Sequence, residues 1–136
     1  MNGGSMRLKA LVADDDPLMR RLCRGVLELA GCEVITANNG REAVELARQE
    51  LPQVIILDLV MPETSGLEAF HQLKQSEPTK AIPIILISGS LDREGQEAIE
   101  ASGAAGFLSK PFRPGALIEA IKPLLLQAAE QGTARA

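Results

Sequence analysis

Short apolar runs alternate along this chain with longer segments that carry apolar residues at helical spacing. Five runs are rich in aliphatic residues, at positions 8–13, 33–37, 54–57, 82–87 and 105–109. Runs of this length and composition predict β-strands. Three of them (LKALVA, VIIL and IPIILI) are almost continuously apolar, as strands covered on both faces of a sheet should be. The run at 33–37 is more polar, which predicts an edge strand.

Helix signals follow each apolar run. Asp16 is the predicted N-cap of the first helix, Pro17 its first residue, and Gly31 the residue that ends it. Its core-facing stripe is expected to consist of Leu18, Leu22, Val26 and Leu29. The second helix is expected at 40–50, with Ala43, Val44 and Ala47 buried.

The last three helices have separate start and stop signals. Ser65 and Glu68 form a predicted capping box at the start of the third helix. The fourth is expected at about 92–102. The fifth begins near Pro114, and Pro123 inside it is expected to kink or shorten it. Its expected apolar face consists of Leu117, Ile121 and Leu124.

The alternation of strands and helices predicts a single α/β domain. Such βαβ units have right-handed crossovers and build a parallel sheet. The chain has 136 residues, a common length for one compact domain. We expect the domain to span residues 7–127. Residues 1–6 are then a flexible lead-in or an expression remnant, and residues 128–136 are a polar tail.

The composition of the chain argues against several classes of function. Fourteen Lys and Arg against 18 Asp and Glu give a net charge of −4, which argues against general binding of nucleic-acid backbones. Aromatic residues make up only 2%, so stacking surfaces for bases or flavins are scarce. The two cysteines, Cys23 and Cys32, are interpreted as reduced, buried thiols. No apolar run approaches the ~20 residues of a membrane span, so we expect a cytoplasmic protein without membrane insertion.

Polar residues that could carry chemistry follow the predicted strands. Asp14 and Asp15 come after the first strand, Asp58 after the third, Ser88 after the fourth and Lys110 after the fifth. In an open parallel sheet, ligands bind beyond the carboxyl ends of the strands, where the strand order reverses. With the order 2-1-3-4-5, all of these residues would face one crevice. Asp16 has a structural role as helix cap, but Asp14 and Asp15 do not.

Three carboxylates at one rim would repel one another unless a cation were bound. The repulsion would raise their pKa values. A hard divalent cation removes that penalty, and Mg²⁺ prefers one or two carboxylates together with water and phosphate oxygens. The acids therefore predict a Mg²⁺ site.

The stretches VADDDP, VIILDLVMPETSG, LISGS and FLSKPF resemble the receiver domain of two-component response regulators. The resemblance to this CheY-like family spans about residues 7–127. It implies a flavodoxin-like (βα)5 fold, a doubly wound parallel sheet of five strands in the order 2-1-3-4-5. It also implies a switch in a phosphorelay, turned on by phosphorylation.

The resemblance assigns roles to the polar residues one by one. Asp58 matches the aspartate that accepts the phosphoryl group, and Asp14 and Asp15 match the acidic pair that holds Mg²⁺. The backbone carbonyl of Val60 would be a further metal ligand. Lys110 matches the lysine that pairs first with the acceptor aspartate and then with the phosphoryl oxygens.

Other matched positions would shape the site or transmit its state. Ser88 matches the hydroxyl residue that bonds a phosphoryl oxygen, and Phe107 matches the aromatic switch position, where Tyr is common. Because Phe lacks the hydroxyl, we expect a packing switch at most; a plain core aromatic is the alternative. The loop-shaping positions are Pro62, Gly66, Gly89 and Pro111, and the Lys110–Pro111 bond is cis in relatives.

Two positions next to the site are expected to tune the lifetime of the phosphoryl group. Val60 and Ser90 each lie two residues beyond a matched site residue, where relatives often carry side chains that steer the hydrolytic water. Val60 cannot hydrogen-bond water, so we predict a longer-lived phosphoryl group than with Asn at this position.

The resemblance also predicts the partners. The phosphoryl group would come from a sensor histidine kinase, a histidine phosphotransfer protein or a small acyl phosphate, because His71, the single histidine, is interpreted as a structural or surface residue. The fourth helix, fifth strand and fifth helix would form the surface that binds an output partner. No enzymatic activity is expected beyond self-phosphorylation and self-dephosphorylation of Asp58. The chain is either a stand-alone receiver or part of a longer regulator.

Three alternatives share parts of this pattern. A receiver fold could act as a scaffold that does not depend on phosphorylation. An aspartate-nucleophile phosphatase of the haloacid-dehalogenase type would use a DxD motif after the first strand, which Asp14 and Asp16 superficially supply. A flavodoxin-like cofactor binder would need hydroxyl residues in the first loop, which is acidic here.

Overall fold

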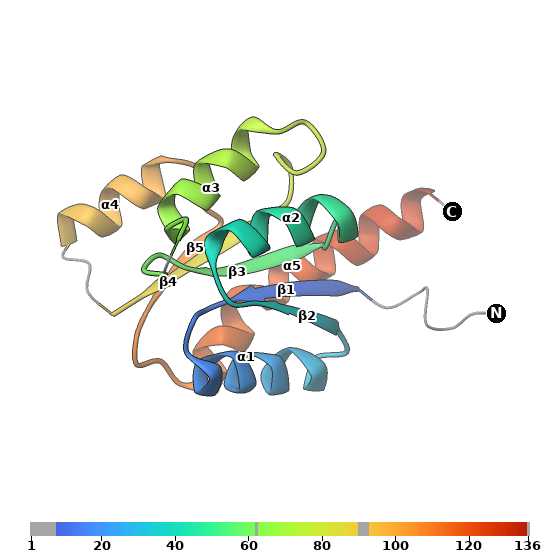
Figure 1. Cartoon of the computed structure of the whole chain (residues 1–136). Coiled ribbons are helices and arrows are strands. Elements are labelled where there is room, and N and C mark those ends of the chain that lie inside the picture. The colour runs from blue at the N-terminus through green and yellow to red at the C-terminus, as the bar shows by residue number, and fades with distance from the viewer. Residues whose placement is uncertain (1–7, 62, 90–92, 136) are drawn as a thin grey trace.

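A computed structural model describes residues 8–61, 63–89 and 93–135 of the chain (Figure 1). Its five parallel strands form one sheet in the order β2-β1-β3-β4-β5, as predicted. The strands are β1 (Lys9–Ala13), β2 (Glu33–Ala37), β3 (Val54–Asp58), β4 (Ile84–Ser88) and β5 (Gly106–Ser109). The helices are α1 (Pro17–Leu29), α2 (Gly40–Glu50), α3 (Gly66–Gln75), α4 (Arg93–Ala101) and α5 (Pro114–Arg135). The predictions for residues 1–6, Pro62 and Ser90 lie outside the described residues.

Two helical layers cover the sheet. Helices α1 and α5 lie on one face, and α2, α3 and α4 lie on the other (Figure 1). Because successive side chains of a strand point to opposite faces, β1 contributes to two separate cores. Leu11 and Ala13 belong to the core under α2 and α3, whereas Ala10 and Val12 belong to the core under α1 and α5. Every residue of β3 and β4 is buried, as their apolar sequences predict.

The predicted core face of α1 is wrong by about a quarter of a helical turn. Leu18 and Leu29, expected inside, are 70% and 89% exposed. The buried residues of the helix are instead Cys23, Val26 and Leu27. These three residues are spaced i, i+3 and i+4, so they lie on one side of the helix. Cys23, and not Leu18, therefore supplies apolar surface to the core. The caps match the prediction: Asp16 accepts a hydrogen bond from Leu18 N, and Gly31 has a φ of 95°.

The predicted limits of α2 and the predicted N-cap of α3 are confirmed. α2 runs over Gly40–Glu50 and buries Ala43, Val44 and Ala47. The Ser65 hydroxyl caps α3 by accepting a hydrogen bond from Glu68 N at 3.2 Å. Both helices begin at the end of the sheet that carries the acidic residues.

Helix α5 is longer than the sequence suggested. Pro123 was expected to kink or shorten it, but the helix continues to Arg135 and includes most of the predicted polar tail. Pro123 is exposed, and on a solvent-facing side water can hydrate the carbonyl that loses its partner. Leu117 and Ile121 are buried and Leu124 half-buried, so the predicted apolar face is confirmed. None of the described helices has the length and apolar character that crossing a membrane requires.

Candidate functional site

The register of the central strands brings two distant aspartates together. Ala13 of β1 pairs with Leu57 of β3, so the next residues, Asp14 and Asp58, lie side by side at the carboxyl ends of the two strands. Both are buried, with exposures of 0% and 4%. Their strands are central and fully covered, which leaves the carboxylates little contact with water. Two carboxylates in such a position need cationic or hydrogen-bonding partners.

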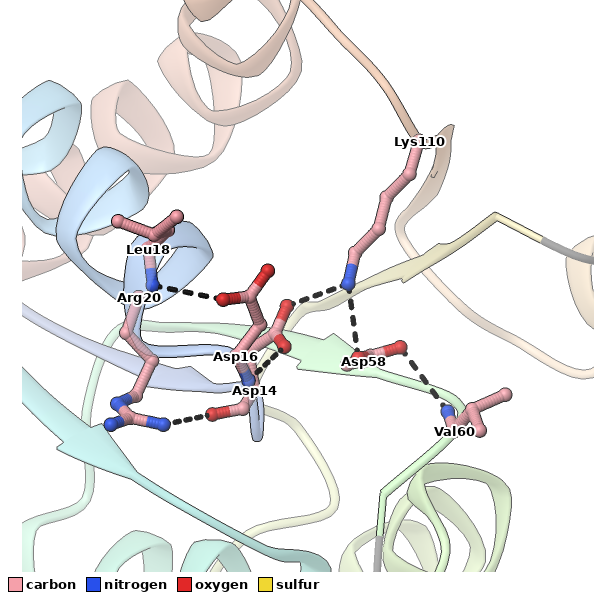
Figure 2. Close-up of polar contacts among 7 residues, drawn as sticks. All are labelled: Asp14, Asp16, Leu18, Arg20, Asp58, Val60 and Lys110. Atoms are coloured by element: carbon pink, nitrogen blue, oxygen red, sulfur yellow. Dashed lines mark hydrogen bonds and ion pairs between the residues drawn. The ribbon is translucent and has the colours of Figure 1, made fainter.

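Lys110, which directly follows β5, contacts both carboxylates. Its Nζ lies 2.9 Å from Asp14 Oδ2 and 3.1 Å from Asp58 Oδ2 (Figure 2). The backbone places it, because Lys110 N donates to Ser88 O at 2.9 Å just beyond β4 and β5. The Lys110–Pro111 bond is cis, as the resemblance implied. Burial alone would lower the pKa of Lys110, but its contacts with Asp14 and Asp58 outweigh burial and raise it.

The backbone around Asp14 fixes its carboxylate. Asp14 Oδ1 accepts a hydrogen bond from Asp16 N at 2.9 Å. The guanidinium of Arg20 donates to the carbonyl oxygen of Asp14 at 2.7 Å, a contact that the sequence did not predict (Figure 2). Arg20 comes from the first turns of α1, and only the angle between that helix and β1 brings it there. Asp14 Oδ2 is buried and, among the described residues, accepts no hydrogen bond despite its ion pair with Lys110.

Asp58 lies in a mixed electrostatic environment. Its Oδ1 accepts a hydrogen bond from Val60 N at 3.2 Å, and its Oδ2 faces Lys110. Burial and the charge of Asp14 raise the pKa of Asp58, and the contacts with Val60 N and Lys110 offset this only in part. The charged carboxylate is therefore destabilised by its surroundings. This environment therefore favours a reaction of the Asp58 carboxylate, or the binding of a cation that offsets its charge.

Asp15 completes a cluster of acids. Carboxylate oxygens of Asp14, Asp15 and Asp58 lie within 4.8 Å of one another, so the predicted gathering of the acids is confirmed. Two of these residues are buried and Asp15 is exposed at the mouth of the site. A set of carboxylate oxygens is the kind of ligand set that Mg²⁺ prefers. The buried Asp14 Oδ2, which accepts no hydrogen bond within the described part of the chain, fits the same interpretation.

Asp16 does not join the cluster. Its Oδ1 accepts a hydrogen bond from Leu18 N at 3.0 Å and caps α1, as predicted (Figure 2). The three consecutive acids at positions 14–16 therefore have two roles: Asp14 and Asp15 belong to the cluster, and Asp16 caps α1.

The remaining matched residues border the cluster. Ser88 is buried at the end of β4. A Cβ on Gly66 would lie 1.8 Å from Asp58 O, so only glycine fits there, whereas a Cβ on Gly89 would make an ordinary 3.5 Å contact with Lys110 Cβ. Val60 is 64% exposed beside Asp58.

Phe107 and His71 lie away from the acids. Phe107 is half-buried on β5 and packs against the core under α2 and α3. His71 is exposed on α3, and its ring meets that of Phe70 edge-on at 5.6 Å.

A buried thiol lies behind the site. Cys23 of α1 is fully buried, and burial, with a further contribution from the Asp14 charge, raises its pKa to about 12. Cys32 is also buried and free. Both thiols are buried and free, as predicted.

Comparisons with known proteins agree with this geometry. A family model described as "Response regulator receiver domain" matches residues 10–122. The polar-differentiation response regulator DivK of Brucella anthropi is 34% identical over 120 residues, which cover 88% of this chain and 98% of the relative.

Solved structures give the same result. The chemotaxis response regulator CheY4 of Vibrio cholerae is 33% identical, with a TM-score of 0.80 over 87% of this chain and 98% of that one. The receiver domain of the Francisella response regulator 1452 is 28% identical, with a TM-score of 0.82 over 90% of this chain and 99% of that one.

Proposed function

Because the chain belongs to the response regulator receiver family of two-component systems, we propose that it is a signalling switch that accepts one phosphoryl group on Asp58. A carboxylate oxygen of Asp58 attacks phosphorus in line. The bond from phosphorus to the donor breaks, and its electron pair leaves with the donor. The product is an acyl phosphate, and its hydrolysis releases phosphate and restores the carboxylate.

The observation that carries this proposal is the placement of Asp58. Its carboxylate stands at the end of a buried strand, with Val60 N on one oxygen and Lys110 Nζ on the other. The raised pKa of Asp58 reflects a site in which the free carboxylate is poorly stabilised. Lys110 contacts both Asp14 and Asp58, so it can keep its contact with Asp14 and turn to the phosphoryl oxygens once Asp58 is phosphorylated.

We propose that Mg²⁺ is the cofactor. Asp14, Asp15 and Asp58 would hold it through carboxylate oxygens, and Val60 through its carbonyl. When bound, Mg²⁺ offsets the charge of the acids and of the phosphoryl oxygens. Without a cation, three carboxylates against one lysine would repel an incoming phosphate.

The state of Asp58 would be transmitted through Ser88 and Phe107. Ser88 ends β4 next to Asp58, and Phe107 lies on the adjacent β5 in pairing with Leu86. We propose that Ser88 bonds the phosphoryl oxygen and that Phe107 repacks, which shifts the population of the surface made by α4, β5 and α5. That surface would bind the output partner.

The proposed setting follows the family. The phosphoryl donor would be a sensor histidine kinase or a histidine phosphotransfer protein in the cytoplasm. Beyond the turnover of its own phosphoryl group, the protein would have no enzymatic activity. A phosphatase of the DxD type is disfavoured because Asp16 caps α1.

The proposal is tested by intact mass after incubation with acetyl phosphate. Wild type with Mg²⁺ should gain the mass of one phosphoryl group, and wild type with a chelator should gain none. Asp58→Asn should gain none under either condition, because the amide is not a nucleophile for this transfer.

Asp16→Asn is the matched control. Asn also caps helices well, so this variant should fold and be phosphorylated like wild type. A phosphoryl group that maps to another residue, or repeated turnover of phosphate esters, would contradict the proposal. Failure of wild type to take up phosphate, with partner binding retained in Asp58→Ala, would favour the phosphorylation-independent scaffold.

A further inference from the structure

The loop that follows the acceptor aspartate is held from outside by the start of a different helix. This β3–α3 loop comprises residues 59–65, of which all but Pro62 are described. Gly40, the first residue of α2, donates its backbone N–H to Thr64 O at 3.1 Å. The first N–H groups of a helix have no partner within it, so they need acceptors elsewhere. Here the β3–α3 loop supplies one.

This contact leaves no room for a side chain on Gly40. A Cβ there would lie 2.0 Å from Thr64 O and 2.8 Å from Thr64 C. Both are backbone atoms, which cannot rotate away as the end of a side chain can. The φ of Gly40 is not in the left-handed region, so the close approach alone requires glycine.

A second contact links the same two segments. Asn39 Oδ1 caps α2 by accepting a hydrogen bond from Glu42 N at 2.8 Å. The amide nitrogen of the same side chain donates to Glu63 Oε2 at 3.3 Å. Asn39 therefore caps its helix with one atom and holds the β3–α3 loop with the other.

The far end of the loop is also fixed, at Asp58 itself. Gly66 N donates to Leu59 O at 3.0 Å, and a Cβ on Gly66 would collide with Asp58 O. Between these two ends, Val60 N holds Asp58 Oδ1. Thr64 and Val60 belong to the same short loop, so the contact of Gly40 with Thr64 limits where Val60 N, and with it Asp58 Oδ1, can lie.

We propose that Gly40 is a positioning residue for the Asp58 site, although it lies on α2 and touches none of the acids. Its N–H and its missing Cβ set the place of the β3–α3 loop, and so the direction of the Val60 carbonyl and of the Asp58 carboxylate. The inference rests on the function proposed above. Mg²⁺ demands nearly ideal octahedral geometry, so small errors in ligand position weaken its binding.

The test compares Gly40→Ala with Gly25→Ala. Gly25 lies in α1, where an added Cβ meets no described atom within 4 Å. Three quantities are measured: Mg²⁺ affinity by calorimetry, the rate of phosphorylation by acetyl phosphate, and the amide resonances of Leu59 and Val60. In Gly40→Ala we expect Mg²⁺ affinity and rate to fall by about tenfold or more, as for other residues that orient metal ligands. The amide resonances should shift even without metal. Gly25→Ala should match wild type in all three.

Two further variants keep the test decisive if Gly40→Ala does not fold. Asn39→Ser and Asn39→Asp both preserve the cap of α2 but remove the amide that holds Glu63. Asn39→Asp also places a like charge against Glu63, so its loss of Mg²⁺ affinity should exceed that of Asn39→Ser. Wild-type Mg²⁺ affinity and amide resonances in every variant that folds would overturn the inference.

The outcomes also separate this inference from the proposed function. If wild type is phosphorylated and Gly40→Ala is phosphorylated equally fast with equal Mg²⁺ affinity, the positioning role is wrong and the switch function stands. If wild type is not phosphorylated, the proposed function fails, and Mg²⁺ affinity and the Val60 resonance still decide the role of Gly40.

Discussion

At the scale of single residues, one lysine and three acids set the chemistry. Lys110 is shared between Asp14 and Asp58, and Asp14 Oδ2 has this ion pair but no hydrogen bond from the described residues. The backbone satisfies the other oxygens through Asp16 N and Val60 N. The carboxylates are therefore held in place but only partly neutralised, a state suited to binding a cation and then a phosphoryl group.

Val60 provides the first prediction at this scale. It is exposed beside Asp58 and offers water no hydrogen bond from its side chain. In Val60→Asn, the amide can orient a water molecule toward the acyl phosphate, so we expect the phosphoryl group to decay several-fold faster. The decay is followed by intact mass after removal of the donor.

Val60→Leu is the control, because Leu has nearly the shape of Asn without its amide. It should decay like wild type. Equal decay in Val60→Asn and wild type would show that this position does not control hydrolysis.

At the scale of elements, α1 shows how packing selects one face of a helix. Leu22 and Val26 fit both the predicted stripe and the observed one, so the pattern alone allowed two rotations. The observed rotation buries Cys23 and Leu27 and leaves Leu18 and Leu29 in solvent. It also turns Arg20 toward the carbonyl of Asp14.

Two leucines of α1 therefore differ in their contribution to stability. Leu27→Ala should lower the free energy of unfolding by about 2–5 kcal/mol, because it leaves a cavity in a closed core. Leu29→Ala should change it by less than about 0.5 kcal/mol, because its side chain is already in water. Urea unfolding followed by circular dichroism measures both, since the chain has no Trp.

The two variants replace the same residue type within one helix, so helix propensity cancels between them. Equal losses of stability would mean that the rotation of α1 is not the one described.

At the scale of the whole molecule, the buried charge of the site lowers the stability of the fold, and a bound cation can restore that stability. Burial and the charge of Asp14 raise the pKa of Asp58 above its ordinary value of 3.8. A carboxyl group with a raised folded-state pKa favours folding while it is protonated. That contribution is lost as the pH rises through the raised pKa, so ionisation of Asp58 lowers the stability of the protein when no cation is bound.

Mg²⁺ should therefore stabilise the wild type at pH 7. A free concentration a hundred times Kd adds about 2.7 kcal/mol to the free energy of unfolding. Asp58→Asn, which removes the buried charge, should be more stable than wild type without metal and should gain less from Mg²⁺. Thermal unfolding with Mg²⁺ or with chelator measures these differences. An equal gain from Mg²⁺ in both proteins would place the cation elsewhere.

The sequence alone determined much of this protein. Apolar runs and caps located all five strands and the starts of the five helices to within a few residues, because strand burial and helix capping depend on neighbouring residues. The strand order 2-1-3-4-5 followed from the resemblance, and with it the meeting of Asp14, Asp58 and Lys110. These residues could be found because each lies at the carboxyl end of a strand or directly after it, and parallel strands end at one edge.

Other features were decided only by the tertiary structure. The rotation of α1, the contact of Arg20 with Asp14 O, the continuation of α5 past Pro123 and the fit of Gly40 against Thr64 have no distinctive local pattern. Each depends on how helices and strands pack against one another and against solvent, which the local sequence does not specify. A local sequence pattern indicates the conformation that a residue favours. The backbone atoms that approach that residue are determined only when the sheet and its two helical layers pack together.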